Sequence, residues 1–344
     1  MAPPLSLSSM RRCPHCDAPL PGTSEACASC FRSTAVCGGF RLGDELGKGG
    51  LGTVYAAESE SGQRAAVKVL PLSPLNPAAV HEVFRDSARL LATLQHPSLP
   101  RVLGVESHTQ RSFLALERLD GGTLAQRVMA GERFIGPSLR ALLDDLLAVV
   151  QHLHDEEILH GDLTPRNVMF RANDRRPVLI DFDGIAADGD ARYPTLVVTP
   201  GYTAPEQRAG EVSIEADLYG VGATAYYAAT GRSPNSLDRH GGRPDLGHVR
   251  ADAVTKAVLA ALLHLDPARR PRSAELAQRL LASEHEPLEL PAAPPAMART
   301  SPRRPLVLTL VAAALAAVVG ITVASQAASI GSAPSPASSV HSIH

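Results

Sequence analysis

The sequence of 344 residues contains no tryptophan, and aromatic residues make up only 4% of it. We therefore expect a core built mostly from aliphatic side chains. The net charge at neutral pH is only −2, which gives no general attraction to nucleic acid or to an anionic membrane surface. The first ten residues lack the long apolar run of a secretory signal. The overall balance, 44% hydrophobic and 20% charged, is typical of a globular chain.

Lysine is also scarce: the chain has 30 arginines but only three lysines, Lys48, Lys68 and Lys256. Codon bias, with the three remaining lysines at random positions, would account for this usage. The alternative is that at least one position requires a compact ammonium group rather than the planar fork of a guanidinium. Lys68 is the candidate for such a position, because it follows a glycine-rich segment.

Four of the five cysteines form two CxxC pairs that are separated by ten residues: Cys13, Cys16, Cys27 and Cys30. Zinc takes four such ligands in a tetrahedron at a Zn–S distance of about 2.3 Å, and each pair offers two thiolates from one side. In a cytoplasmic chain, zinc and reduced thiols are favoured over disulfides. We therefore predict a structural Zn²⁺ site over residues 10–33, which resemble the small zinc ribbons at the ends of many bacterial proteins.

This segment is too short for a hydrophobic core, so the metal would supply most of its folding free energy. The alternative is a disordered arm whose cysteines are redox-active. Cys37 lies outside the pattern and is expected to be a small apolar residue. His15 lies inside the first pair, and we expect a solvated loop residue there rather than a ligand.

The chain changes character after residue 284. Residues 285–305 are rich in Pro and Ala, which predicts a linker. Residues 306–324 carry no charge, and nineteen helical residues span about 28 Å, close to the thickness of a bilayer core. We predict one transmembrane helix there, and the alternative is a buried core helix.

The charges around this apolar segment predict its orientation. Arg299, Arg303 and Arg304 precede it, and basic residues favour the cytoplasmic side of a membrane. We therefore expect a single-pass protein of the inner or cell membrane, with residues 40–284 in the cytoplasm and a short tail, residues 325–344, outside. Ala316 and Gly320 lie in a stripe of small residues that would let two copies pack as a homodimer.

A glycine-rich turn occupies residues 46–55, between two apolar stretches. Glycines let backbone N–H groups approach phosphate oxygens, because no Cβ stands in the way. In a dinucleotide-binding fold a helix would begin directly after such a turn. Here residues 53–59 and 64–70 instead have the pattern of two strands joined by a turn at Gly62. Lys68 lies on the second of these strands.

Further motifs follow in a fixed order along the chain. They are Phe113-Leu-Ala-Leu-Glu117, His160-Gly-Asp162-Leu-Thr-Pro-Arg-Asn167, Asp181-Phe182-Asp183, Ala204-Pro205-Glu206, Asp217-Leu-Tyr-Gly and Asp266-Pro-Ala-Arg-Arg270-Pro. Together with the glycine-rich turn and the Ala-x-Lys68 strand, they resemble the motifs of eukaryotic-like serine/threonine protein kinases of bacteria, many of them membrane-anchored. The resemblance covers residues 40–284.

The resemblance implies a two-lobed α+β fold, with a small β-rich N-lobe and a helical C-lobe. It also implies that ATP is the phosphate donor and that protein hydroxyls are the acceptors. Lys68 would hold the α- and β-phosphates, and Asp162 would accept or orient the hydroxyl proton. Asn167 and Asp181 would hold Mg²⁺, or Mn²⁺, through oxygen ligands. Other nucleotide-contacting positions would be Leu46, Gly47, Gly49, Gly52, Val54, Ala66, Glu117 and Leu119, with Leu116 as the gatekeeper.

Three positions in the catalytic motifs depart from the family pattern. Gly161 replaces the arginine that usually grips a phosphorylated activation loop, so we expect activity that depends little on phosphorylation of Thr195. Thr164 replaces a lysine that usually contacts the γ-phosphate, and Arg166 either fills this gap or is a solvated surface residue. Asp183 replaces the glycine of the metal-binding triplet.

The partner of Lys68 is the fourth departure. Residues 80–94 have helical spacing, and counting back from His96-Pro97 places the family's glutamate at Ser87. Serine cannot form the ion pair. Asp86 lies about 100° around the helix from Ser87, and Glu82 lies five residues earlier. Either acid would serve only if the helix rotates or slides.

Three functions are therefore weighed. An active serine/threonine protein kinase is favoured by Lys68, Asp162, Asn167 and Asp181. An ATP-binding pseudokinase scaffold is favoured by the residues at positions 87, 164 and 183. A small-molecule kinase of related fold is disfavoured by the Ala-Pro-Glu segment, because such enzymes usually lack this peptide-docking element.

Overall fold

The computed structural model of the protein describes residues 11–20, 24–49, 52–71, 78–108, 111–182, 186–187, 198–240 and 242–283. The predicted linker, transmembrane helix and tail lie outside these residues, as do Asp183 and Thr195. Within the described ranges, no helix combines the length and the apolar character needed to cross a membrane.

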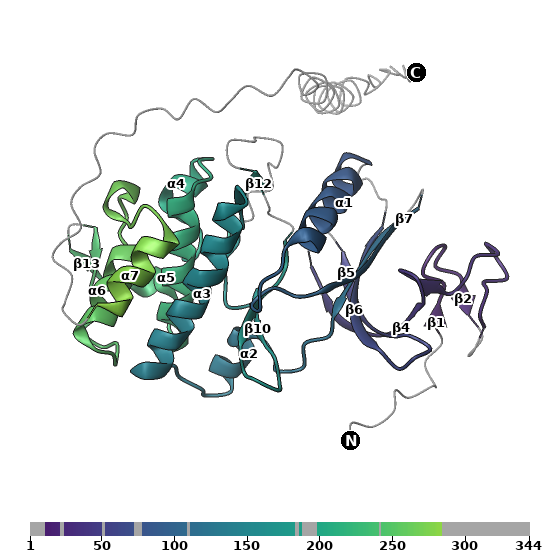
Figure 1. Ribbon diagram of the computed structural model, residues 1–344, viewed down its shortest axis with the longest axis horizontal. Coiled ribbons are helices and arrows are strands. Elements are labelled where there is room, and N and C mark those ends of the chain that lie inside the picture. Colours follow the sequence, from purple (N-terminus) through teal and green to yellow (C-terminus); the bar gives the residue numbers. More distant parts are fainter. Residues whose placement is uncertain are drawn as a thin grey trace, which may run out of the picture. The chain divides into compact units, whose positions relative to one another are not determined.

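The N-terminal lobe is built on a six-stranded antiparallel sheet with the strand order β3-β4-β5-β6-β8-β7 (Figure 1). Its strands are β3 (Ala35–Val36), β4 (Phe40–Lys48), β5 (Thr53–Glu58), β6 (Arg64–Pro71), β7 (Val102–Ser107) and β8 (Arg111–Glu117). The hairpin predicted after the glycine-rich turn is confirmed as β5 and β6. Successive side chains of β6 face opposite sides of the sheet, so this strand contributes to two separate clusters of buried residues.

Helix α1 (Ala78–Thr93) covers one face of this sheet, as the predicted helical spacing over residues 80–94 requires. Phe84 and Ala88 of the helix form a buried cluster with Leu70 and Leu114 of the sheet. A second, separate cluster of buried sheet residues contains Val67 together with Val36, Phe40 and Phe113. The N-lobe core is thus divided by the sheet.

The cysteine-rich segment forms a small unit before the sheet. Strands β1 (Arg11–Arg12) and β2 (Pro19–Leu20) pair antiparallel, and a bridge joins Ala26 to Ser33. Leu20 is its only large aliphatic residue in a buried cluster otherwise made of cysteines, among the residues described. This small apolar content agrees with the expectation that the segment cannot fold on hydrophobic burial alone.

The C-terminal lobe is mainly helical. Its helices are α2 (Leu124–Met129), α3 (Pro137–Asp155), α4 (Pro205–Arg208), α5 (Ile214–Thr230), α6 (Ala253–Leu262) and α7 (Ala274–Ala282), with the 3₁₀ turns η1 (Pro234–Ser236) and η2 (Pro267–Arg269). Its short strands pair as β9 (Ile158–Leu159) with β12 (Ala186–Ala187), β10 (Val168–Phe170) with β11 (Pro177–Leu179), and β13 (Arg239–His240) with β14 (Arg243–Pro244).

The core of this lobe is dominated by Leu, Val and Ala, as the lack of tryptophan predicted. Helix α5 is buried along almost its whole length, and α3 turns one leucine-rich face toward the same core. Side-chain caps fix where the helices begin: Ser213, Asp252 and Ser273 each accept a hydrogen bond from a backbone N–H of the first turn. The two-lobed α+β architecture is thus confirmed.

Candidate active site

Lys68 is held in the middle of the N-lobe sheet. Strand β6 lies between β5 and β8, and Lys68 is opposite Val54 on one side and Leu114 on the other. The Lys68 Nζ atom lies 2.8 Å from Oδ1 of Asp181, and the lysine side chain is only 12% exposed. Asp181 follows β11 and has a φ of 65°, a left-handed conformation that aspartate tolerates better than most residues. Two residues 113 positions apart therefore form one ion pair.

The described glycines of the glycine-rich turn lie on either side of the step from β4 to β5. The N–H of Gly49 donates to the carbonyl oxygen of Gly52 at 2.8 Å. A Cβ atom at Gly52 would lie 2.4 Å from the carbonyl oxygen of Val69, so only glycine fits at this crossing. Gly47 is opposite Val54 in the ladder, and Leu46 is exposed. The close approach of the backbone at Gly52 accounts for part of the glycine pattern.

Asp162 and Asn167 form the centre of the predicted catalytic loop. The Nδ2 atom of Asn167 donates to the Asp162 carboxylate at 2.8 Å and to the Asp162 carbonyl oxygen at 2.9 Å. Thr199 Oγ1 donates to the other carboxylate oxygen at 3.1 Å. The N–H of Ile180 donates to the Asn167 carbonyl at 2.7 Å, which ties this loop to the residue before Asp181.

The Asp162 carboxyl group has a perturbed acidity. Burial raises its pKa above the ordinary value, because the charged form loses hydration. The charge of His160 and the hydrogen bonds from Thr199 and Asn167 act in the opposite direction, and the negative charge of Asp181 adds to the increase. A carboxylate that is partly desolvated and aimed by two neutral donors is suited to accept or orient a proton.

Asp217 of α5 holds the loop that carries Asp162 through hydrogen bonds to its backbone. The N–H groups of His160 and Gly161 donate to the two Asp217 carboxylate oxygens, both at 2.9 Å, and His154 Nε2 lies 3.0 Å from one of them. Burial alone raises the pKa of Asp217, but the hydrogen bond and charge of His154, with His160 and the Gly161 N–H, outweigh it and lower the pKa. Asp217 is therefore a buried carboxylate that holds the loop.

Gly161 has a backbone requirement of its own. Its φ is 76°, in the left-handed region where a side chain is strained. Its carbonyl oxygen accepts a hydrogen bond from Gln207 Nε2 at 2.5 Å. Glycine at this position thus meets the backbone conformation of the loop without the arginine of the family pattern. Thr164 is buried, and Arg166 is exposed.

The segment predicted to follow the gatekeeper lies at the end of β8. Leu116 is opposite Ala66 in the ladder, and Leu119 is buried. The Glu117 carboxylate pairs with Arg171 and, at 3.2 Å, with Arg101. The pair of Glu117 with Arg171 thus joins the two lobes, a role that the sequence did not reveal.

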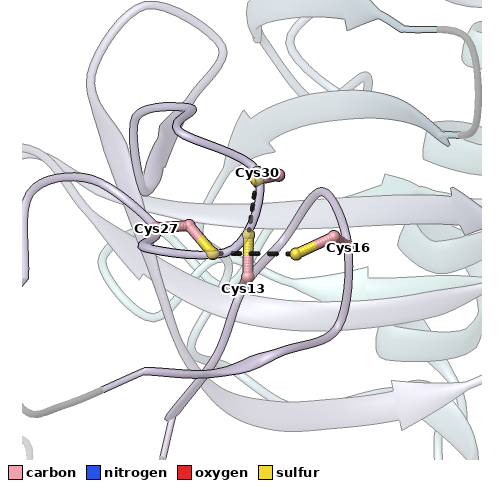
Figure 2. A group of neighbouring side chains, drawn as sticks. All are labelled: Cys13, Cys16, Cys27 and Cys30. Atoms are coloured by element: carbon pink, nitrogen blue, oxygen red, sulfur yellow. Dashed lines mark hydrogen bonds between the residues drawn. The ribbon is translucent and has the colours of Figure 1, made fainter.

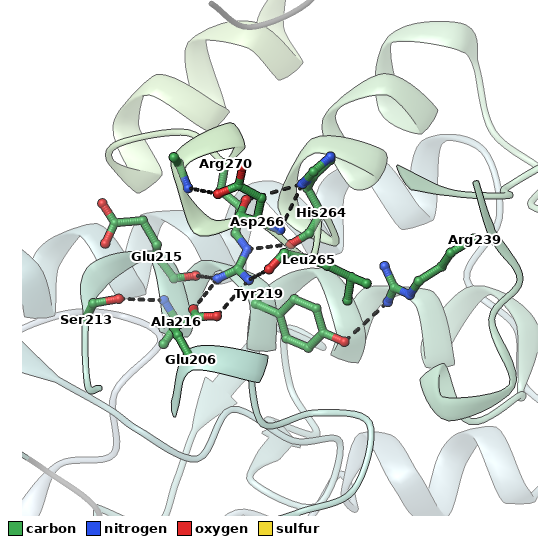
Figure 3. A network of polar contacts seen from close by, with 11 residues as sticks. Glu206, Ser213, Glu215, Ala216, Tyr219, Arg239, His264, Leu265, Asp266 and Arg270 are labelled. Carbon is green, nitrogen blue, oxygen red and sulfur yellow. Dashed lines mark hydrogen bonds and ion pairs between the residues drawn. The ribbon is translucent and has the colours of Figure 1, made fainter. Parts of the chain in front are cut away.

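The end of the activation segment is anchored by the predicted pair of Glu206 and Arg270, which is confirmed. The arginine, which is almost fully buried, donates from Nη2 to Glu206 at 3.0 Å and from Nη1 to the Glu215 carbonyl oxygen at 2.8 Å. Its Nε atom donates to the His264 carbonyl oxygen at 2.8 Å, so that one guanidinium ties together the segments around α4, α5 and η2 (Figure 3). The Arg270 guanidinium also lies over the ring of Tyr219.

Helix α1 does not present a glutamate at the expected place. Ser87 is half-buried on the helix, whereas Glu82 and Asp86 are exposed. Asp86 lies 3.5 Å from Arg89 on the same helix. Helix α1 is therefore neither rotated nor shifted so as to bring Glu82 or Asp86 inward. Lys68 forms an ion pair with Asp181.

The four cysteines of the two CxxC pairs converge on one point (Figure 2). The sulfur of Cys13 is 3.6 Å from that of Cys30, and the sulfur of Cys16 is 3.6 Å from that of Cys27. Four thiolates around one zinc ion would be separated by about 3.8 Å, so this donor set fits the metal. Backbone N–H groups, above all that of Cys30, lower the pKa of Cys27 to about 6, whereas burial raises the pKa of Cys13 to about 12.

The expectation that His15 is a solvated loop residue is wrong. His15 is 6% exposed, and its ring lies 5.5 Å from the ring of Phe113 and 4.8 Å from that of His108. The hairpin of β7 and β8 contacts the residues between Cys13 and Cys16, where Arg111 donates to the Pro14 carbonyl oxygen at 2.9 Å. No sequence pattern pointed to this contact, because its two sides lie almost a hundred residues apart.

Comparison with known families supports the assignment of the fold. The sequence profile described as "Protein kinase domain" matches residues 40–281. Serine/threonine-protein kinase C of Synechocystis sp. is 32% identical over 214 residues, which cover 58% of this chain and 40% of that protein. Serine/threonine-protein kinase pkn2 of Myxococcus xanthus is 31% identical over 280 residues, which cover 74% of this chain and 34% of that protein.

The chain therefore spans well under half the length of these two relatives. Among solved structures, it is similar to the crystal structure of Rad53 1-466 in complex with AMP-PNP, with a TM-score of 0.58. That likeness covers 70% of this chain and 64% of the other, at 24% sequence identity, and concerns the fold alone.

Proposed function

The chain belongs to the protein kinase family, and from this premise we propose that it is a serine/threonine protein kinase. It would move the γ-phosphate of Mg-ATP onto hydroxyl groups of protein substrates. One observation carries the proposal: the fold brings four polar residues of three motifs into two contacting pairs, Lys68 with Asp181 and Asn167 with Asp162.

The chemistry of phosphoryl transfer explains why these four residues suffice. The transition state is loose, so catalysis consists mainly of positioning and charge neutralisation. Lys68 would hold phosphate oxygens as a point charge, and the Asp162 carboxylate would accept or orient the proton of the attacking hydroxyl. The Asn167 amide donates through its nitrogen to Asp162, which leaves its oxygen for a cation.

Asn167 and Asp181 would hold Mg²⁺, or Mn²⁺, because both offer the oxygen ligands that these cations prefer. When bound, the metal neutralises charge on the phosphates. Asp181 already lies against Lys68, so the site pairs a fixed positive charge with the carboxylate that would take the metal. The donor set therefore fits the cofactor that the family uses.

A second candidate function is an ATP-binding pseudokinase that acts as a scaffold. It is favoured by the serine at position 87 and by the ion pair that Lys68 forms with Asp181 rather than with an acid of α1. In this alternative, nucleotide binding is retained and transfer is residual.

The experiment that separates the two compares phosphate transfer by the full chain and by Asp162→Asn, with radiolabelled Mg-ATP and a generic protein substrate. We expect labelled substrate with the wild type and a loss of at least about 100-fold in Asp162→Asn, the range that a positioned acid–base group contributes. Asp155→Asn, an exposed aspartate at the end of α3, is the matched control and should transfer normally. Equal labelling by the wild type and Asp162→Asn would favour the pseudokinase.

We further propose that activity depends little on phosphorylation of the activation segment. Gly161 occupies the position of the arginine that grips a phosphorylated loop in relatives, and its left-handed φ suits glycine. Thr195→Ala should therefore transfer phosphate at nearly the wild-type rate. A large loss of rate in this variant, with unchanged ATP affinity, would overturn the idea.

We also propose that Cys13, Cys16, Cys27 and Cys30 hold one structural Zn²⁺. The proposal is supported by the four convergent sulfurs and by the scarcity of apolar residues in the segment. Zinc analysis of the purified chain tests it, with Cys37→Ala as the control, because Cys37 lies outside the cluster and is buried in the N-lobe.

Finally, we propose that residues 306–324 anchor the protein in the cell membrane as a single-pass helix, with the kinase domain in the cytoplasm. The support is the uncharged run itself and the three arginines before it. Extraction of membranes with alkaline carbonate should leave the full chain in the pellet and release a chain that ends at residue 300. A homodimer through Ala316 and Gly320 would be tested by cross-linking in detergent.

A further inference from the structure

A second group of potential metal ligands lies beside the cysteine cluster, at the contact between the first CxxC pair and the N-lobe sheet. It consists of His15, Glu106 at the end of β7, and His108 just after that strand. One ligand atom from each residue lies within 4.8 Å of the others. No motif of the phosphate site includes these residues, and neither the kinase chemistry nor the four thiols require them.

The tautomer of His15 leaves one ring nitrogen for a ligand. Its Nε2 atom lies 3.0 Å from the Ser33 carbonyl oxygen, which can only accept, so Nε2 carries the proton. The other nitrogen, Nδ1, is buried and has no hydrogen-bond partner. A histidine that ligates a metal commonly donates its other ring N–H to a backbone carbonyl in this way, and the arrangement fixes the ring and raises its basicity.

The two partners of His15 are also oriented from outside the cluster. One Glu106 carboxylate oxygen contacts His108 Nε2, and the other accepts the N–H of Cys37. The rings of His15 and His108 lie edge to face at 4.8 Å, with Phe113 against both. Glu106 and His108 keep about a quarter of their side chains exposed, so the group is reached from solvent on one side.

We propose that His15, Glu106 and His108 form a second site for a divalent cation of the zinc type, distinct from the four cysteines. Two imidazoles and one carboxylate are a common donor set for zinc, and they leave a fourth position for water. A hard cation such as Mg²⁺ would instead be expected to require an oxygen-rich site.

Binding of a zinc ion requires the three ligand atoms to move closer together. Three ligands at about 2.0–2.1 Å from one zinc ion would lie about 3.4 Å apart, against the present limit of 4.8 Å. The hydrogen bond between His108 and Glu106 is exchanged for two bonds to the cation. A neutral His108 then keeps its single proton on the ring nitrogen that does not bind the cation, and a doubly protonated His108 releases one proton to solvent.

The consequence of the site is structural. His15 belongs to the cysteine-rich segment, whereas Glu106 and His108 belong to the β7–β8 side of the N-lobe sheet. The cation would therefore link the cysteine-rich segment to this sheet. Hydrogen exchange in β7 and β8 should therefore slow when zinc is added beyond the first equivalent.

The test is the metal stoichiometry of the full chain. Apo-protein is dialysed against buffered free zinc and then analysed for metal and protein. We expect about two zinc ions per chain for the wild type and about one for Glu106→Gln and for His108→Gln, because both substitutions keep a hydrogen-bonding side chain but remove a good zinc ligand. His248→Gln, which lies in the C-lobe against Tyr226, is the matched control and should bind about two.

Cobalt substitution separates this site from the cysteine cluster. Thiolate-to-cobalt absorption in the near ultraviolet comes only from the four cysteines, so it should saturate with the same intensity in the wild type and in His108→Gln. Visible cobalt absorption should continue to grow with a second equivalent in the wild type alone. A wild type that saturates at one zinc, or a His108→Gln variant that still binds two, would overturn the proposal whatever the state of the cysteine site.

Discussion

At the scale of single residues, the carboxylate of Asp162 is held by Asn167 Nδ2 and Thr199 Oγ1. Both donors are neutral, and both oppose the increase in pKa that burial causes. The catalytic form is the carboxylate, so activity should be lost as the pH falls through a pKa that lies above the ordinary aspartate value.

Removing one donor should move this acid limb. Thr199→Val takes away a hydrogen bond that lowers the pKa of Asp162, so the pKa rises further and kcat/KM should begin to fall at a higher pH than in the wild type. The pH dependence of phosphate transfer measures this, and Thr199→Ser, which keeps the hydroxyl, is the control. Superimposable profiles for Thr199→Val and the wild type would show that Thr199 does not act on Asp162.

Ser87 is the residue at which an added group should increase activity. A glutamate there would offer Lys68 a carboxylate from α1 and leave Asp181 freer to take the metal. We expect Ser87→Glu to raise kcat by about 3- to 10-fold, equivalent to about 1 kcal/mol of transition-state stabilisation. Arg89→Glu, which adds a glutamate on the exposed side of the same helix, should leave kcat unchanged. A fall in kcat for Ser87→Glu would mean that the Lys68–Asp181 pair is itself the working arrangement.

At the scale of elements, helix α5 determines the shape of the catalytic loop through one buried side chain. Asp217 accepts the N–H groups of His160 and Gly161 and lies against His154. The loop is thus held by a carboxylate that lies 57 residues after His160 and 56 after Gly161 and is buried in the C-lobe.

Asp217→Ala should therefore destabilise the domain by about 3–5 kcal/mol, because two buried N–H groups and a histidine lose their partner. The pKa of Asp217 is lowered in the folded protein, so its contribution is fully present above the unfolded value and disappears as the pH falls through the folded one. Urea unfolding at several pH values measures this. The difference in free energy of unfolding between wild type and variant should be largest near neutral pH and should shrink in acid. A constant difference would contradict the role of the charge.

At the scale of the whole molecule, the cysteine-rich segment and the kinase domain should respond separately to loss of metal. A strong chelator should unfold the cysteine-rich segment, because little apolar surface holds it together, whereas the helical C-lobe should keep its thermal transition. Hydrogen exchange with and without chelator distinguishes the two regions. Protection of the segment that is unchanged after complete removal of zinc would contradict the metal's structural role.

Much of this organisation was predictable because the motifs are local in sequence. Asp162 and Asn167 lie five residues apart, and the cysteine spacing predicts a metal site without knowledge of the fold. The strand hairpin that carries Lys68 follows from the alternation of side chains around Gly62.

Contacts between distant segments were not predictable in the same way. The burial of His15 depends on the β7–β8 hairpin almost a hundred residues later, and the ion pairs of Glu117 depend on Arg171 of the other lobe. The pairing of Lys68 with Asp181 was also not predicted, because the sequence indicates a missing glutamate but not which acid takes its place. Such contacts are set by the packing of the lobes rather than by any local period.

The Mg-ATP site is tested most directly by calorimetric titration of ATP into the full chain, with and without Mg²⁺. The titration compares the wild type with Asp181→Asn and Asp162→Asn. We predict that the wild type binds ATP more tightly when Mg²⁺ is present, that Asp181→Asn loses this dependence on Mg²⁺, and that Asp162→Asn binds like the wild type. A wild type that fails to bind ATP, or that binds with an affinity indifferent to Mg²⁺, would contradict the site built from Lys68, Asn167 and Asp181.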